Sequence, residues 1–236
     1  GDGVLTVTDK NSGTKLGIDT VSGIETLRFV DGDLAVKTHQ NGNVTLTGTD
    51  DAGDVVTIVG DQTVTIEGVG GNDFLTGGNG DDTISAGSGN DTIEGGKGND
   101  VIAGGEGDDL VLLAGNKGDF TFSFASDGVL TLTDLDGETI LGVDTISGVE
   151  TLRFNDGEMS IDTTAEGYVS LTGTEVGDNV LIVGATPVSI QGAEGHDVIV
   201  GGSGSDTIDG GIGDDTIDGG IGQDQIFGGE GDDLII

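Results

Sequence analysis

The sequence predicts an all-β protein with two right-handed parallel β-solenoid blocks, each preceded by an extension rich in β-strands. Three observations predict this fold. A nine-residue unit repeats five times in each of two blocks. Glycine supplies 49 of the 236 residues, and such an excess disfavours helices. The aliphatic residues within the units follow the alternating spacing of short strands.

The chain is a duplication of one module. Residues 2–49 match residues 127–174 at 28 of 48 positions, and the two repeat blocks then align unit for unit. Because the first copy starts at a turn and the last unit has no cap, we expect a two-module part of a longer array. The expected divisions are an extension over 1–67, a repeat block over 68–112, a linker strand with a second extension over 113–191, and a second block over 192–236.

The extensions are predicted to contain strands as well. In the first we expect strands at 4–8, 25–29, 44–47 and 64–66, with counterparts in the second, where a strand at 120–124 should turn into one at 129–133. GDVV (53–56) and GDNV (177–180) are interpreted as degenerate turns that carry the solenoid upstream. Arg28 and Arg153 lie near Glu25 and Glu150 in the sequence, which favours structural ion pairs.

The repeat blocks share one strict pattern. The first block reads GVGGNDFLT, GGNGDDTIS, AGSGNDTIE, GGKGNDVIA and GGEGDDLVL, and the second starts with GAEGHDVIV. In all ten units the fourth residue is Gly, the sixth is Asp and the eighth is Leu, Ile or Val, whereas positions three, five, seven and nine vary. The glycines permit a turn, and the last three residues form a short strand with its central aliphatic side chain inward.

Two units are expected to form one coil, so that unit i stacks on unit i+2. The interior is then a ladder of the eighth-position residues, namely Leu75, Ile84, Ile93, Ile102, Val111, Ile199, Ile208, Ile217, Ile226 and Ile235. The same stacking places the aspartates at the strand spacing of about 4.8 Å. Carboxylates so close repel unless a cation lies between them, and a cage of oxygen ligands alone suits Ca²⁺.

These units resemble the RTX (repeats-in-toxin) nonapeptide GGxGxDxUx, which forms the calcium-binding parallel β-roll of secreted bacterial proteins. The resemblance covers residues 68–112 and 192–236 and implies about six full Ca²⁺ sites, with partial sites at the block ends. It implies that the side-chain ligands are Asp73, Asp82, Asp91, Asp100, Asp109, Asp197, Asp206, Asp215, Asp224 and Asp233. It implies that carbonyl ligands include those of Gly78, Gly80, Gly96, Gly98, Gly202, Gly204, Gly211 and Gly213. Val69 and Ala193 replace the second glycine of the first units, which weakens the expectation for the sites beside them.

Other functions are disfavoured by the sequence. The chain has no Cys and no G-x-S-x-G elbow, and its two histidines, His39 and His196, are interpreted as surface residues, so we expect no enzyme. Lys and Arg number 7 against 44 Asp and Glu, and the net charge of −37 should repel nucleic acids and other polyanions. No apolar run is long enough to insert into a membrane.

Two functions stay open at this point. One is a calcium-folded structural segment of a bacterial surface or secreted array, such as an adhesin stalk, a surface layer or a filament, whose partners are neighbouring modules or identical chains. The alternative is the C-terminal secretion and folding module of an enzyme or toxin exported by type I secretion. Both predict an extracellular location and a chain that folds when it meets Ca²⁺.

Overall fold

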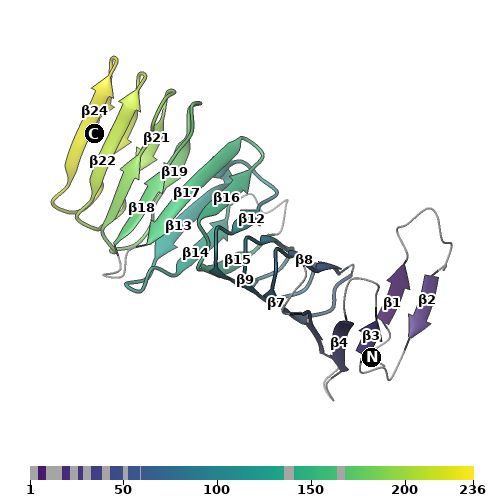
Figure 1. The fold of residues 1–236 in the computed structure, drawn as a ribbon. Coiled ribbons are helices and arrows are strands. Elements are labelled where there is room, and N and C mark those ends of the chain that lie inside the picture. The colour runs from purple at the N-terminus through teal and green to yellow at the C-terminus, as the bar shows by residue number, and fades with distance from the viewer. Residues whose placement is uncertain are drawn as a thin grey trace.

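The structure is a computed structural model that describes residues 5–8, 18–21, 26–28, 33–38, 43–49, 53–58, 60–135, 141–163 and 168–236, with the backbone alone before residue 43. The described part is an elongated stack of β-strands whose first and last strands lie at opposite ends (Figure 1). It contains no α-helix, and its one short 3-10 helix is η1 (Lys117–Asp119). The predicted all-β fold class is confirmed.

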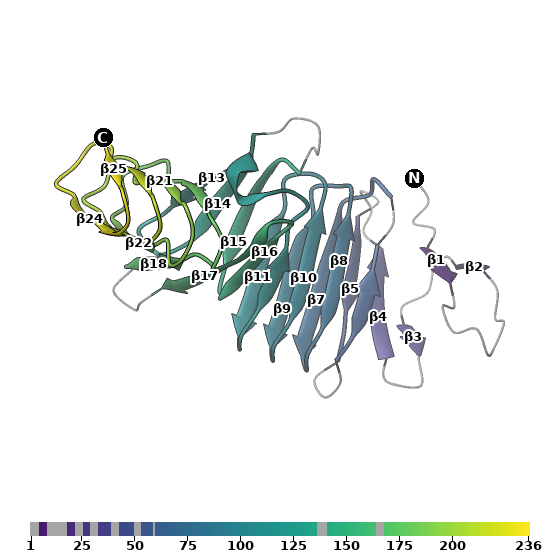
Figure 2. The ribbon, with the colours of Figure 1, turned by 90° about the horizontal axis from the view of Figure 1, so that it is seen from above.

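The first solenoid has two facing rows of parallel strands. Each coil contributes one strand to each row, and Figure 2 shows the strands of one row side by side. One row contains β5 (Val44–Thr47), β7 (Val64–Gly70), β9 (Thr83–Ser88), β11 (Val101–Glu106) and β15 (Val143–Ser147). The other contains β6 (Val55–Thr57), β8 (Phe74–Gly78), β10 (Thr92–Gly96), β12 (Leu110–Leu112) and β16 (Thr151–Phe154).

The strand registers confirm that unit i stacks on unit i+2. Ile93 pairs with Leu75 on one side and Val111 on the other, while Ile102 pairs with Ile84 in the opposite row. The parallel ladder also continues beyond the repeat units, because Ile146 pairs with Ile102 and Leu152 pairs with Val111. The solenoid therefore begins upstream of residue 68 and takes its last strands from the segment after residue 112.

An antiparallel insert separates the two solenoids. It consists of β13 (Phe120–Phe124), β14 (Leu130–Asp134) and β17 (Gly157–Thr163). The expected hairpin is present, since β13 pairs with β14, and β14 then pairs with β15. Phe120, Phe122 and Phe124 alternate inward and are buried, and the rings of Phe120 and Phe154 lie 5.5 Å apart.

The second solenoid repeats the first. Its rows are β18 (Val169–Thr172), β20 (Val188–Gln191), β22 (Thr207–Ile212) and β24 (Gln225–Glu230), and β19 (Asn179–Leu181), β21 (Val198–Val200), β23 (Thr216–Asp218) and β25 (Leu234–Ile235). β17 joins the two solenoids because it is antiparallel to both β16 and β18. The expected continuation of the solenoid upstream is confirmed, since β6 and β19 begin within GDVV and GDNV and start the second row of each stack.

The N-terminal strands form antiparallel pairs. β1 (Leu5–Thr8) pairs with β2 (Ile18–Val21), and β4 (Asp33–Thr38) lies between β3 (Thr26–Arg28) and β5. The strands expected at 4–8 and 25–29 are thus found within one residue at each end, and residues 4, 25 and 29 lie outside the described part.

The interior ladder is an unbroken column of aliphatic side chains. Eight of the ten eighth-position residues are almost fully buried: Leu75, Ile84, Ile93, Ile102, Val111, Ile199, Ile208 and Ile217. Ile226 is only partly buried and Ile235 is 51 % exposed, because β24 and β25 have no strand stacked on their outer edges among the described residues. Burial of one such side chain contributes about 2 kcal/mol, so each added coil stabilises the stack.

Candidate metal centre

The sixth residue of every unit ends a turn and directly precedes a strand. Strand stacking therefore brings the aspartates of alternate units into line along the solenoid. Eight of these side chains are no more than 3 % exposed, namely Asp73, Asp82, Asp91, Asp100, Asp109, Asp197, Asp206 and Asp215. Asp224 and Asp233, in the last two units, are half-buried.

One carboxylate oxygen of each aspartate is held by the neighbouring coil. The backbone N–H of Asp73 donates to Asp91 Oδ1 at 2.7 Å, and the N–H of Asp91 donates to Asp109 Oδ1 at 2.8 Å. In the second block the N–H of Asp197 donates to Asp215 Oδ1 at 2.8 Å. These bonds run from unit i to unit i+2 and fix the orientation of each carboxylate.

The other oxygen, Oδ2, has no donor. It is buried without a hydrogen-bond partner in Asp73, Asp82, Asp91, Asp100, Asp109, Asp197, Asp206 and Asp215. A buried carboxylate oxygen without a donor costs several kcal/mol of desolvation, unless the group is protonated or coordinates a cation. The same unpaired oxygen in eight equivalent positions points to a bound cation.

The first glycine of the unit leaves space next to this oxygen. A Cβ added at Gly77 would lie 2.6 Å from Asp82 Oδ2 and 2.5 Å from the carbonyl oxygen of Gly95 in the next coil. A Cβ at Gly210 would lie 2.3 Å from Asp215 Oδ2 and 2.4 Å from the Gly228 carbonyl oxygen. A carboxylate oxygen and a carbonyl oxygen thus converge on one small space in both blocks.

These first-position carbonyls were not among the predicted ligands. They belong to Ala86, Gly95, Gly210, Gly219 and Gly228. The available signal was the first column of the repeat, which is Gly in nine of ten units. A side chain there would fill the space over Oδ2, and this explains the preference.

The predicted second- and fourth-position carbonyls lie along the column of turns. Those of Gly78 and Gly202 accept 2.8 Å hydrogen bonds from the N–H groups of Lys97 and Ile221 in the next coil, which leaves each a second lone pair. The other predicted positions also stack on their counterparts in the next coil. Gly96 pairs with Gly78 across parallel strands. A Cβ atom added to the glycine one coil further on would contact the carbonyl oxygen in each remaining case, namely Gly80, Gly98, Gly204, Gly211 and Gly213.

The second position of every unit has positive φ, including the two units without glycine. Val69 and Ala193 both have φ of 83°, and Gly78 and Gly211 have φ of 115° and 105°. The first turns of both blocks therefore keep the common conformation, and Asp73 and Asp197 after them are placed like the other aspartates.

Burial makes these carboxyl groups reluctant to ionise. It raises the pKa of Asp82 from its ordinary 3.8 to about 7, and repulsion from Asp100 and Asp81 adds to the effect. Burial also raises the pKa to about 6 in four other row aspartates, namely Asp73, Asp100, Asp109 and Asp197. A divalent cation would remove both the desolvation cost and the repulsion.

Four more carboxylates extend the rows beyond the repeat units. Asp144 Oδ1 and Glu150 Oε2 accept the N–H groups of Asp100 and Asp109, each at 2.9 Å. Asp54 and Asp178 stand one coil before the blocks, where their N–H groups donate to Asp73 and Asp197 Oδ1 at 2.7 Å. The signal for Asp144 was the triplet Asp144-Thr145-Ile146, which has the Asp-Thr-Ile sequence of several units.

In the second solenoid, a lysine lies beside the first carboxylate of the row β19–β21–β23–β25. The ammonium of Lys117 is buried, 2.9 Å from Asp178 Oδ1 and 3.5 Å from Asp156 Oδ1. It neutralises the first carboxylate of that row, and η1, the helix that carries it, thereby ties the insert to the second solenoid.

The fifth position, expected to vary freely, is a second hydrogen-bonded ladder. Asn72 Oδ1 accepts the N–H of Asn90, and His196 Nδ1 accepts the N–H of Asp214, both across one coil. All ten fifth-position residues carry a side-chain acceptor (Asn, Asp, Ser, Gln or His), so the column is restricted in chemistry although not in identity. His196 is thus a turn residue at the surface, and His39 lies outside the described residues.

The proposed ion pair of Arg153 with Glu150 is wrong. Arg153 Nε donates to Glu158 Oε1 at 2.7 Å across the antiparallel pair β16–β17, while Glu150 accepts from the backbone of Asp109. Glu150 is close to Arg153 in the sequence, but β17 runs antiparallel beside β16 and places Glu158 opposite Arg153. The side chains of Arg28 and Glu25 lie outside the described part.

The donor set suits a hard cation held partly by the backbone. In the described residues no three Asp, Glu or His side chains converge on one point, so carbonyl oxygens must complete any coordination shell. Carboxylate and carbonyl oxygens are the ligands of Ca²⁺, which accepts six to eight of them in flexible geometry. The fold and the site thus define a parallel β-solenoid with cation-binding turns.

Comparison with protein families gives this class a name. Residues 65–93, 76–111, 85–118, 175–208 and 200–235 match the family described as RTX calcium-binding nonapeptide repeat (4 copies). The two repeat blocks of this chain belong to that family, as the units predicted. No curated protein matches the chain.

Proposed function

We propose that this chain is a calcium-folded structural segment of an extracellular bacterial array. The observation that carries the calcium part is the row of eight buried Oδ2 atoms without donors. Six of them lie next to a carbonyl oxygen of the following coil, namely those of Asp73, Asp82, Asp109, Asp197, Asp206 and Asp215. The duplicated module supports the array part, because the second solenoid repeats the strand order of the first. None of the helices in the described ranges could span a lipid bilayer.

The mechanism follows from the electrostatics of the rows. Where Ca²⁺ is scarce, folding would bury carboxylates against one another, and the chain stays unfolded. Where Ca²⁺ is abundant, the binding free energy becomes folding free energy. Extracellular calcium modules respond at roughly 10⁻⁴–10⁻³ M, which suits a chain that is exported unfolded and folds outside the cell.

A calcium titration followed by far-ultraviolet circular dichroism tests the proposal. We expect a coil spectrum in chelator, a cooperative β spectrum with Ca²⁺, and a much weaker response to Mg²⁺, which gives up its water reluctantly. Native mass spectrometry should count about six Ca²⁺, plus partial sites at the row ends. Equal β content with and without chelator would refute the proposal.

Two isosteric variants sharpen this test. Asp206→Asn removes one row carboxylate, whereas Asp209→Asn makes the same charge change three residues further on, in β22 and outside the row. We expect the calcium midpoint to rise several-fold for Asp206→Asn only, with loss of a bound ion. An equal shift in both variants would mean that net charge, not the row, controls folding.

A further inference from the structure

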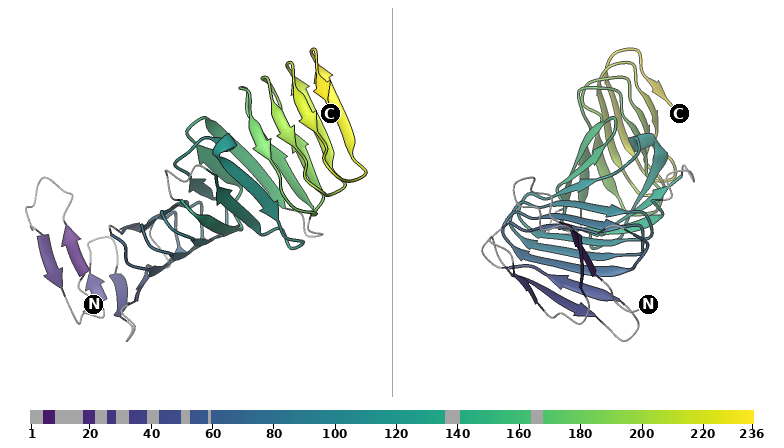
Figure 3. Two further views of the ribbon diagram at one scale, coloured as in Figure 1. Left: turned by 180° about the vertical axis from the view of Figure 1, so that it is seen from behind. Right: turned by 90° about the vertical axis from the view of Figure 1, so that its right-hand side faces the viewer.

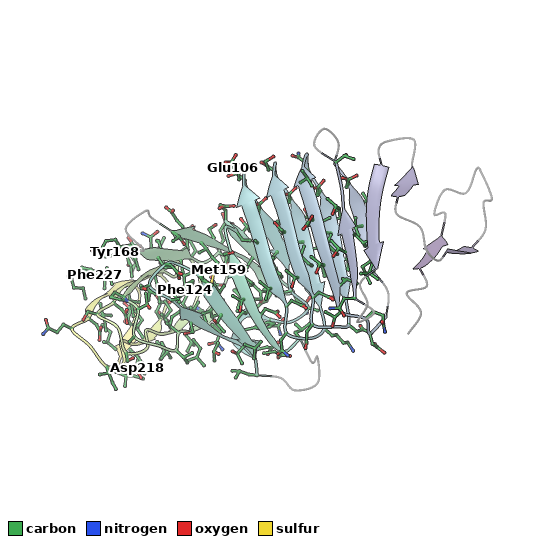
Figure 4. The ribbon with its side chains drawn as sticks, turned by 90° about the horizontal axis from the view of Figure 1, so that it is seen from below. Glu106, Phe124, Met159, Tyr168, Asp218 and Phe227 are labelled. Atoms are coloured by element: carbon green, nitrogen blue, oxygen red, sulfur yellow. The ribbon has the colours of Figure 1, made fainter. Side chains whose placement is uncertain are left out.

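The C-terminal end of the second solenoid is an open, apolar strand edge. β24 and β25 are the last strands of their rows (yellow in Figure 3), and in the described residues neither has a neighbour on its outer side. Leu234, Ile235 and Ile236 are 56 %, 51 % and 72 % exposed, and Phe227, labelled in Figure 4, is 56 % exposed. Such an edge is a template for pairing with another strand.

The equivalent edge of the first solenoid is covered. β24 and β25 correspond to β11 and β12, since residues 224–236 repeat residues 100–112. There β15 and β16 continue the rows in parallel, and Ile102 and Val111, the counterparts of Ile226 and Ile235, are no more than 1 % exposed. The N–H groups of Thr145 and Thr151 complete the ladder by donating to the carbonyl oxygens of Asp100 and Asp109 at 2.8 and 3.0 Å.

The N-terminal strands repeat the covering segment in sequence and in register. Residues 19–29 are identical to residues 144–154 at 9 of 11 positions. β1 pairs with β2 in the register of β14 with β15: Leu5 faces Val21 as Leu130 faces Ile146. β3 pairs with β4 in the register of β16 with β17. What β2 and β3 lack, in the described part, is the parallel neighbour that β15 and β16 have.

We propose that β24 and β25 of one copy of this chain bind β2 and β3 of a second copy, in the register that β11 and β12 have with β15 and β16. Ile226 would then pair with Val21 of the second copy, and Ile235 with its Leu27. The N–H groups of Thr20 and Thr26 would donate to the carbonyl oxygens of Asp224 and Asp233. Asp19, which corresponds to Asp144, would extend the row that ends at Asp224.

This inference rests on the calcium-folded array proposed above and specifies its contact. The two surfaces differ, so the contact is heterologous, and it repeats head to tail into an open filament. Main-chain pairing supplies affinity, and the aliphatic ladder fixes the register. The same contact would join successive modules within one longer chain.

Sedimentation velocity of the 236-residue chain in saturating Ca²⁺ tests the contact. We expect a concentration-dependent series of linear oligomers. Ile235→Asp should abolish it, whereas Val176→Asp, at a turn residue that is 55 % exposed and lies at the start of the second solenoid, should not. Thr20→Pro should also abolish it, because proline removes the N–H that would face the second copy. Circular dichroism must show that each variant folds; if Ile235→Asp does not, Ile236→Asp replaces it.

Mixing the two blocked variants gives the decisive result. The Thr20→Pro chain keeps an intact C-terminal edge and the Ile235→Asp chain keeps an intact N-terminal one, so the mixture should form dimers and nothing larger. A wild-type chain that shows the calcium-induced β spectrum yet sediments as a monomer would overturn the contact and leave the calcium proposal standing. Oligomers that persist in both variants would point to lateral association and also overturn it.

Discussion

Each sixth-position aspartate divides its two oxygens between two tasks. Oδ1 accepts a backbone N–H from the coil before and so orients the carboxylate. Oδ2 is buried without a donor in eight of the ten, and in six of these it lies beside a carbonyl of the coil after. Aspartate suits both tasks because its side chain is short enough to stay within the turn. This explains why the chain has 33 Asp against 11 Glu.

The second position of the unit offers a test of backbone strain. Val69 and Ala193 have φ of 83°, a region that costs a residue with a Cβ about 1–2 kcal/mol. Ala193→Gly should therefore raise the free energy of unfolding by about 1 kcal/mol in saturating Ca²⁺, as measured by chemical denaturation. Ala103→Gly is the matched control, because Ala103 lies within strand β11 without positive φ, and it should lower stability. Destabilisation by both substitutions would contradict this account.

At the level of elements, the turns and the strands are held by separate ladders. The strands stack through parallel pairing and the aliphatic column, whereas the turns stack through side chains of the fifth position, such as Asn90 Oδ1 with the N–H of Asp108 at 3.2 Å. Both ladders link residues 18 apart, so one coil cannot form without its neighbour. Folding in Ca²⁺ should for this reason be cooperative.

The segment between the two solenoids contains a buried charge, the ammonium of Lys117, which contacts Asp178. Lys117→Met would remove the ammonium that neutralises Asp178 and leave that buried carboxylate without its partner. We expect a loss of about 3–5 kcal/mol in the free energy of unfolding in Ca²⁺, measured by urea denaturation. Lys97→Met, at an exposed turn position, should change stability little. Similar effects for the two variants would show that the pair with Asp178 contributes nothing specific.

At the level of the whole molecule, the acidic rows couple folding to pH as well as to Ca²⁺. Burial raises the pKa of Asp82 and Asp144 to about 7, so the folded form holds protons that the unfolded chain, with a pKa near 3.8, has released. That protonation stabilises the metal-free fold fully below about pH 4, and the contribution is lost as the pH rises through 6 to 7.

The expected pH dependence has opposite signs with and without calcium. In chelator, lowering the pH from 8 to 5 should increase β content, while the calcium concentration at the folding midpoint should rise, because protons compete with Ca²⁺ for the carboxylates. Calcium titrations by circular dichroism across this pH range measure both effects. Asp82→Asn should reduce the pH dependence. A midpoint that does not change with pH would contradict the role of these groups.

The periodic part of the molecule could be predicted from the sequence. Columns that keep one type of residue in all ten units, such as the sixth-position Asp and the eighth-position aliphatic, identify the buried ladder and the carboxylate rows. These columns predict the contacts correctly because each unit stacks on the unit 18 residues away, so the same local pattern recurs at each contact. The hairpin at 120–133 was predictable for a similar reason, since its two strands adjoin one turn.

The sequence by itself determined the class of fold, the stacking period and the aspartates that face one another. Only the tertiary structure decided how the rows end: with Asp144 and Glu150 on one block and with Lys117 beside Asp178 at the start of the next. It also paired Arg153 with Glu158 and showed that first-position carbonyls, not only those of the turn column, lie beside Oδ2. These contacts join segments outside the repeat, where the neighbour in space is set by the path of the chain and no longer by the period.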